Sequence, residues 1–444
     1  MPTVVAVIFY LMLTAEDSGT YSGLMVTPFS WPEHVLFAPT FLKLPLWTYT
    51  QLGLLVALGG KGLAPRMRAR PMDRALFSTV GSVALWAALG MFRGGNTAQM
   101  GFQTFNLLNS VAFAFLLLAV MRTPAHHALL LKAIVVAAVQ RSLLALGFYF
   151  FVVRDLSWKS APEFMTTHDD SVLFVTALVI LGAGAVERVS RRSMPLLLTL
   201  GPLILAAIQV NNRRLAWMGL VAAIVIGYAL LPASPRKRRV NRIMLAVLPV
   251  AVLYVTVGWG RTERIFKPLA SFDSATSETD ASTKSRDNEN AGLIFTFAQG
   301  PKLGTGWGLE YIETDSSLSA RGFLQYRYIP HNSLLAILAF GGWLGFIGIL
   351  MPVPVAVYLN TRTYRAATAP VVRVVAMVGV AEAAICLNQI YGDMGLFSRT
   401  TMAIMAAGFA SAGRLSAWSG GWPVAGKIEG PSGPGARGRD EEGC

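Results

Sequence analysis

The chain has 444 residues, of which 54% are hydrophobic and only 14% are charged. Soluble domains usually have about a quarter of their residues charged, so this composition excludes an ordinary soluble enzyme. The formal net charge is +14, but the cations lie mostly in short clusters between apolar runs. That pattern is typical of membrane topology and gives no support to nucleic-acid binding. The two cysteines, Cys386 and Cys444, cannot form a disulfide framework or a CxxC metal site.

Many apolar runs are long enough to cross a hydrocarbon core of roughly 30 Å. We therefore predict an all-α, polytopic membrane protein with about twelve transmembrane helices and one large periplasmic loop. The predicted spans are 3–14, 41–60, 75–92, 102–121, 128–153, 171–186, 194–210, 215–232, 243–259, 332–357, 374–391 and 397–413.

Clusters of arginine and lysine follow the second, sixth, eighth and tenth predicted spans. All of them fall on one side if every span crosses, and cations in short loops mark the cytoplasmic side. With twelve spans, both termini are then cytoplasmic. The clusters are Lys61, Arg66, Arg68, Arg70 and Arg74; Arg188, Arg191 and Arg192; Arg236, Lys237, Arg238, Arg239 and Arg242; and Arg362, Arg365 and Arg373.

The sequence NNRRLAWMGL places Arg213 and Arg214 in a very short outside loop between the seventh and eighth spans, where cations oppose the orientation rule. One interpretation is a pair of arginines at a helix end that contact lipid phosphates. The other is an anion site, because guanidinium forms planar, bidentate contacts with phosphate. The sequence leaves both interpretations open.

Residues 260–331 form the only long hydrophilic segment, and loops of this length in a compact protein are usually functional or disordered. Its first half, SFDSATSETDASTKSRDNEN, predicts a mobile segment, whereas the aromatics and glycines of GPKLGTGWGLEYIE and GFLQYRYIPHN predict order. No dinucleotide-binding unit follows GTGWG, so we interpret its glycines as turn residues. The loop also contributes Arg261, Arg264, Arg286, Arg321 and Arg327.

His331 and Asn332 stand at the mouth of the tenth span, in IPHNSLLAILAFGGWLGF. A lone histidine at a helix start is often only a cap or an interface residue. The functional interpretation is a base or hydrogen-bond donor at the outer face, because histidine is the usual proton acceptor for a hydroxyl nucleophile.

Residues 415–444 are rich in glycine, serine and proline, cannot bury a core, and predict a disordered cytoplasmic tail. Residues 1–414 then form one transmembrane domain that includes the loop 260–331. The sequence has no Walker A loop, no HExxH, no GxSxG and no DxD that stands out as a metal-binding sugar-nucleotide site. We therefore expect neither a metal nor a cofactor.

The combination of NNRRLAWMGL, a long outside loop with SRDNEN, GPKLGTGWG and HNSLLAILAFGGWLG resembles the bacterial O-antigen ligase and O-antigen polymerase superfamily. The resemblance covers about residues 195–350, and the earlier spans match only in hydropathy. It implies metal-independent transfer of a glycan from a polyprenyl diphosphate carrier, by a multi-pass enzyme of the bacterial inner membrane whose active site faces the periplasm.

The resemblance also implies roles for individual residues. Arg213 or Arg214 and Arg286 would bind the diphosphate, because fixed cations aimed at a leaving diphosphate lower the barrier without a metal. His331 would orient or deprotonate the acceptor hydroxyl. Arg286 and His331 are the expected catalytic residues, Arg261 and Arg264 are further candidates for diphosphate binding, and Asn332 is a supporting residue.

We predict a polymerase that joins undecaprenyl-diphosphate-linked repeat units of an O-antigen, capsule or exopolysaccharide. Both of its substrates carry a lipid diphosphate, and the surplus of outside arginines is compatible with two anion subsites. A ligase that transfers glycan to the lipid A core shares the motifs and stays an alternative. A transporter of lipid-linked glycans is a further alternative, although we find no internal repeat of the kind many transporters have. Candidate partners are membrane lipid, a chain-length regulator and a flippase, and no nucleic acid.

Overall fold

The computed structural model describes residues 1–15, 33–37, 40, 44–59, 71–154, 156, 164–261, 263–266, 268–270, 272, 281–315 and 326–422. Every extended element in these ranges is helical, and eight helices are long and apolar enough to cross a membrane. The prediction of an all-α, polytopic membrane protein is therefore confirmed, while the count of about twelve spans stays a prediction. Helices satisfy all backbone hydrogen bonds internally, as the hydrocarbon core requires.

The α-helices are α1 (Pro2–Thr14), α2 (Leu46–Gly59), α4 (Pro71–Phe92), α5 (Thr97–Val120), α6 (Pro124–Phe148), α7 (Asp170–Glu187), α8 (Ser193–Asn211), α9 (Arg214–Leu230), α10 (Pro235–Gly258), α12 (Ala281–Gln299), α13 (Ser333–Leu350), α14 (Pro352–Ala366), α15 (Pro370–Gly392) and α16 (Arg399–Trp418). A π-helical segment, Tyr149–Val153, continues α6, another covers Glu33–Phe37, and a 3-10 turn covers Arg264–Phe266.

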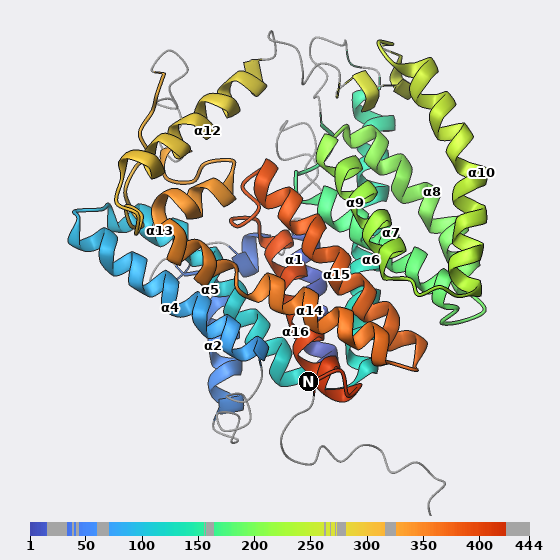
Figure 1. Ribbon diagram of the computed structural model, residues 1–444, viewed down its shortest axis with the longest axis horizontal. Helices are drawn as coiled ribbons and strands as arrows, with labels where there is room; N and C mark the ends of the chain where they lie inside the picture. Colours follow the sequence, from blue (N-terminus) through green and yellow to red (C-terminus); the bar gives the residue numbers. More distant parts are fainter. Residues whose placement is uncertain are drawn as a thin grey trace, which may run out of the picture.

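The middle of the bundle is built on α15, which packs against α7, α9, α14 and α16 (Figure 1). The sequences AEAAICL in α15 and MAAGFASAG in α16 are rich in alanine and glycine. Small side chains let helix backbones approach closely, which is how helices associate where no hydrophobic effect drives them together. By contrast, α10 stands at the edge of the bundle with almost its whole surface exposed.

Besides α10, which begins at Pro235 and not at residue 243, three of the predicted elements differ from the structure. The span predicted at 332–357 is divided into α13 and α14, because Pro352 has no backbone N–H and cannot continue the hydrogen-bond ladder. α16 extends to Trp418, into the segment predicted as tail, because Leu415 is still buried in the bundle. The rest of that tail, residues 423–444, lies outside the described residues.

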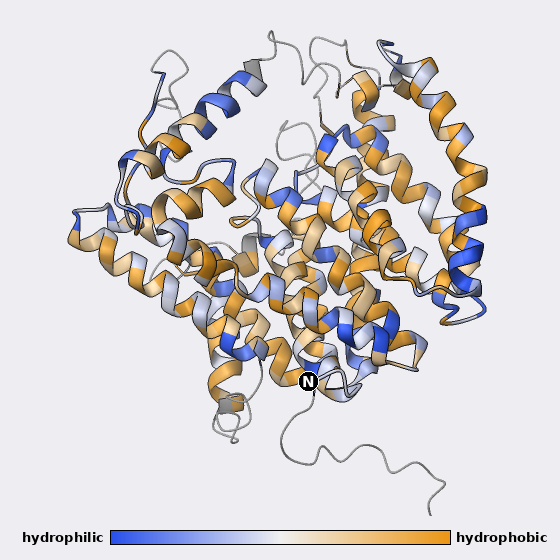
Figure 2. Ribbon diagram, in the orientation of Figure 1, coloured by the Kyte–Doolittle hydropathy of each residue, from blue (hydrophilic) through white to orange (hydrophobic). Residues whose placement is uncertain are grey.

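The third difference concerns the large loop, in which residues 281–290 belong to α12 and are not a mobile segment. The charged sequence has one face that is buried, because Glu289, Leu293 and Thr296 point toward α13 and the loop that precedes it. The first turns are polar on the remaining faces, as Figure 2 shows for the upper end of α12. Residues 273–280 of the predicted mobile segment lie outside the described residues.

One end of the bundle gathers basic clusters around the buried carboxylate of Glu187. This carboxylate accepts hydrogen bonds from Tyr364 (2.8 Å) and Arg236 (2.8 Å), and Arg373 pairs with it at 3.2 Å. Arg236 and Arg373 belong to the clusters after the eighth and tenth predicted spans, and Glu187 precedes the cluster after the sixth. These three clusters therefore lie at the same end of the bundle, where Figure 2 also shows the hydrophilic end of α10.

The GTGWG segment crosses the ends of α4 and α13 in close backbone contact. Gly306 has a φ of +100°, and its N–H donates to the Phe340 carbonyl (2.8 Å), while the N–H of Trp307 donates to the Trp86 carbonyl (3.1 Å). A Cβ on Gly306 would lie 2.4 Å from the backbone nitrogen of Gly90. The interpretation of these glycines as turn residues is confirmed, and the segment fixes α12 and α13 to α4.

The contact between α4 and this segment gives a matched pair of substitutions in one helix. A Cβ on Gly90 would lie 1.8 Å from the Trp307 carbonyl oxygen, whereas a Cβ on Gly81 meets nothing within 4 Å. We expect Gly90→Ala to destabilise the protein by about 1–3 kcal/mol, the usual cost of overpacking. Gly81→Ala should leave stability unchanged or raise it, because alanine is the better helix former. Thermal unfolding of both variants in detergent checks this, and equal midpoints would contradict it.

Candidate active site

A cavity of about 310 Å³ opens at the end of α15 opposite the Glu187 cluster. With 23 residues at about 1.5 Å each, α15 separates the two ends by about 34 Å. Three segments meet at the cavity: the one that precedes α7, the one that precedes α13, and the α15–α16 loop. The lining residues are Thr167, His168, Asp169, Tyr326, Ile329, His331, Asp393, Met394, Phe397 and Ser398.

His331 is held at this cavity by Glu289 of α12. The Glu289 carboxylate accepts from the backbone N–H of His331 at 2.6 Å and pairs with its ring Nδ1 at 3.0 Å. Since a carboxylate accepts a proton-bearing nitrogen, this contact places the proton on Nδ1 and leaves Nε2 as the basic nitrogen of the neutral ring. Such an imidazole is oriented to take a proton at Nε2.

Asn332 ties the start of α13 to α12. Its Oδ1 accepts from the N–H of Leu335 (3.1 Å), which caps α13, and its Nδ2 donates to Oδ1 of Asn290 (3.0 Å). From the other side, the N–H of Met394 donates to the His331 carbonyl (2.6 Å). The backbone of His331 is thus fixed between α12, α13 and the α15–α16 loop.

A second histidine–carboxylate pair, His168 with Asp393, lies at the same cavity. Burial alone raises the pKa of Asp393, but the hydrogen bond and charge of His168, together with the charges of Arg286 and His331, hold this pKa below its ordinary value. His331, His168 and Asp393 line one cavity, and the charge of Arg286 acts on the Asp393 carboxylate.

Arg213 and Arg214 are at the start of α9, which is held beside the end of α15 by a hydrogen bond from Asn388 to the Leu215 carbonyl (2.9 Å). The Arg213 guanidinium lies 3.2 Å from the centre of the Phe164 ring. That ring is in turn 6.2 Å from the ring of His168. Arg213 is thus connected to the cavity through the segment that precedes α7.

The remaining predicted arginines are placed differently. Arg261 is exposed beyond the end of α10, with its guanidinium 5.9 Å from the Phe266 ring, and it does not line the cavity. The backbone of Arg264 begins the 3-10 turn, whereas its side chain lies outside the described part of the structure. Arg321 also lies outside the described residues. Like Arg261, Arg213, Arg214 and Arg286 are not among the residues that line the cavity, so their part in the site stays a prediction.

Residues 198–350 match the family model described as O-antigen ligase. The match covers about a third of the chain and confirms the resemblance of this part to the O-antigen ligase and polymerase superfamily. No curated protein matches the chain. The matched range contains Arg213, Arg286, Glu289 and His331 but neither His168 nor Asp393.

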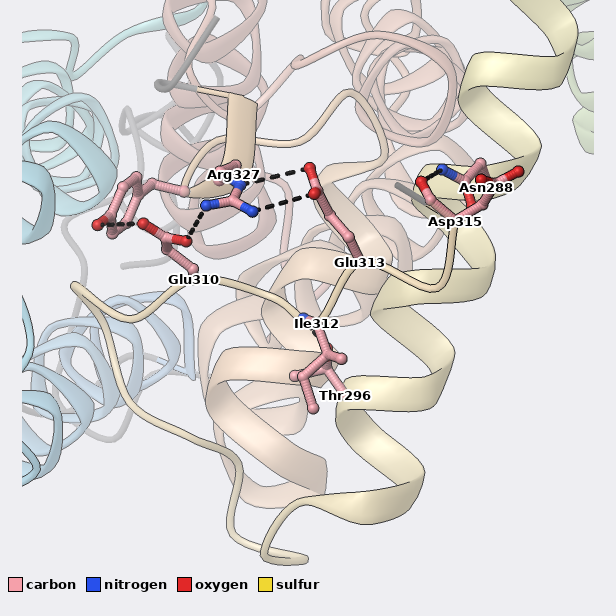
Figure 3. A network of polar contacts seen from close by, with 8 residues as sticks. Asn288, Thr296, Glu310, Ile312, Glu313, Asp315 and Arg327 are labelled. Carbon is pink, nitrogen blue, oxygen red and sulfur yellow. Dashed lines mark hydrogen bonds and ion pairs between the residues drawn. The ribbon is translucent and has the colours of Figure 1, made fainter. Parts of the chain in front are cut away.

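A polar network braces the part of the matched range that carries His331. Arg327 donates to Glu310 (2.6 Å) and, in a two-point contact, to Glu313 (3.0 and 3.3 Å), as Figure 3 shows. The N–H of Ile312 donates to the Thr296 hydroxyl of α12 (2.8 Å). Arg327 therefore joins the segments on either side of residues 316–325 and fixes both of them near α12.

Four residues of the site were not identified from the sequence: Glu289, Asn290, His168 and Asp393. A signal for Glu289 was present, because it lies three residues after Arg286 and would share its face on a helix. His168 and Asp393 lie in short segments outside the matched range 198–350, with no motif around them. Their proximity is apparent only from the fold.

The Glu289–His331 contact predicts a specific loss of function. Glu289→Gln removes the negative charge that holds and balances the imidazole, so transfer should fall by about tenfold or more, within the factor of roughly 10² to 10⁴ that a positioned acid–base group contributes. Asp287→Asn is the matched control, since Asp287 is exposed on the same helix. Glycan transfer by cells that express each variant in a deletion background checks this. Equal transfer by both variants would show that the contact has no part in the reaction.

Proposed function

We propose that the chain polymerises undecaprenyl-diphosphate-linked oligosaccharide repeat units at the periplasmic face of a bacterial inner membrane. The observation that carries the proposal is the cavity that His331, oriented by Glu289, lines within the range matched by the O-antigen ligase model, where the charge of Arg286 acts on Asp393. The basic clusters at the opposite end of α15 support the orientation, because cations in short loops mark the cytoplasm.

The residues fit the chemistry of glycan transfer from a diphosphate. The bond between the anomeric carbon and the diphosphate oxygen breaks, and the electron pair leaves with the diphosphate. Arg286 and Arg213 or Arg214 meet the charge that develops there, so that guanidinium groups supply what a metal supplies elsewhere. The acceptor hydroxyl oxygen forms the new bond to the anomeric carbon, and His331 orients or deprotonates this hydroxyl.

The placement of the arginines favours a polymerase. Arg286 belongs to α12, whereas Arg213 and Arg214 stand at the start of α9. A cation beyond those that meet the leaving diphosphate would suit a second substrate that also carries a lipid diphosphate, as in a polymerase. The description of the matched family as O-antigen ligase keeps transfer to a lipid A core as the second candidate. A flippase that supplies repeat units and a chain-length regulator would be the partners of a polymerase.

Deletion of the gene separates these two functions. Loss of a polymerase should leave single repeat units on the final acceptor, since attachment continues while chain growth stops. Loss of a ligase should instead leave polymer on the carrier lipid. The glycan profile of the deletion strain is the measurement, with the complemented strain as control. Normal chain length and normal attachment would eliminate both functions.

The proposed diphosphate site is tested by two neighbouring substitutions on α12. Arg286→Ala should lower the rate about 10²- to 10³-fold, the typical cost of removing one preorganised group that stabilises developing charge. Lys284→Ala removes an exposed cation from the same helix and should leave the rate unchanged. Polymer formation by purified protein, supplied with lipid-linked repeat units from the deletion strain, measures both. A similar loss in both variants would indicate a general effect of positive charge rather than a site.

A further inference from the structure

The second histidine–carboxylate pair of the cavity has no role in the mechanism described so far. His168 lines the cavity, its side chain is 30% exposed, and its Nδ1 edge is turned to Asp393. Its segment precedes α7 and lies outside the range matched by the O-antigen ligase family. A polar pair of this kind at a solvent-reaching cavity requires an explanation beyond stability.

The segment that carries His168 is fixed from both sides. Before it, the side-chain oxygen of Asn211 accepts the N–H groups of Met165 (3.2 Å) and Thr166 (2.9 Å). After it, Asp170 forms a fully buried ion pair with Arg141 of α6 (2.8 Å). Asn211 is at the end of α8, directly before the turn to Arg213. The bundle therefore positions His168 as firmly as α12 positions His331.

The two imidazoles reach the cavity from different segments. His331 precedes α13 and pairs with Glu289 of α12, whereas His168 precedes α7 and pairs with Asp393 at the end of α15. Arg213, at the start of α9, lies over the Phe164 ring in the segment that carries His168.

In direct displacement at an anomeric carbon, the acceptor hydroxyl loses its proton as its oxygen bonds to that carbon. The base for this proton and the groups that receive the diphosphate are therefore different residues. In the proposed mechanism Arg286 meets the diphosphate, and Glu289 holds His331 by its ring and its backbone N–H. His168 is a second imidazole at the same cavity, and its ring pairs with the Asp393 carboxylate.

We propose that His168 is a second catalytic residue, which accepts the proton of the acceptor hydroxyl while His331 orients this hydroxyl. The inference rests on the proposed glycan transfer. The hydroxyl proton passes to the His168 ring, the hydroxyl oxygen bonds to the anomeric carbon, and the diphosphate leaves with the electron pair of the broken bond. The ring then releases its proton to water at the cavity mouth.

Chemical rescue tests this role. The measurement is polymer formation by the purified full-length protein, supplied with lipid-linked repeat units extracted from the deletion strain. His168→Ala should lower turnover by about 10²-fold or more, the usual contribution of a positioned base. Free imidazole in the buffer should restore part of the rate in proportion to its concentration, because it fills the space and supplies the missing base. His168→Gln should stay inactive with imidazole, since the glutamine side chain occupies that space and does not titrate.

The outcomes distinguish this inference from the proposed function. Wild-type turnover of His168→Ala overturns the role of His168, and so does a loss that imidazole does not restore, which would indicate a structural residue. In either case, losses in Arg286→Ala and His331→Ala leave glycan transfer at this cavity standing. If these two variants also keep full activity, the proposed function itself fails.

Discussion

The contact between the Glu289 carboxylate and His331 positions α12 against the start of α13. α12 lies outside the bundle, and its neighbour among the membrane helices is α13. The Glu289 carboxylate pairs with the ring Nδ1 of His331 and accepts a hydrogen bond from its backbone N–H. The next residue of each segment, Asn290 and Asn332, forms a further hydrogen bond between the two segments. Arg286 lies one turn before Glu289 on the same helix, and its charge acts on Asp393 at the cavity.

Much of the fold follows from the sequence, because an apolar run of sufficient length has few structures open to it in a membrane. The runs predicted α7, α8, α9 and α15 to within a few residues. The prediction that the glycines of GTGWG are turn residues was also correct, since a φ of +100° at Gly306 is accessible mainly to glycine. α12 was missed because its polar first turns resemble a mobile segment, and only the packing of Glu289 and Thr296 shows its buried face.

Residues of the candidate site could be predicted only where the residue type and its position relative to a span both indicated a function. His331 at the start of a span and the arginines in a short outer loop can be recognised from the sequence alone. His168 and Asp393 carry no such signal, since a histidine and an aspartate in separate short loops are common. Their pairing depends on the packing of α7 against α15, which periodicity predicts as two buried helices without stating which of their ends meet.

The two ends of α15 provide an internal comparison for the functional interpretation. At one end, Glu187 is fully buried, and Tyr364, Arg236 and Arg373 satisfy its oxygens, so the cluster closes on itself. Removing one partner of such a cluster is costly because a buried charge is left unpaired, which is the behaviour of a structural lock between helices. At the other end, the paired histidines line a cavity and remain partly exposed. Stability alone would favour closing this second cluster in the same way. An oriented imidazole that lines a cavity is instead the arrangement that proton transfer from a bound hydroxyl requires.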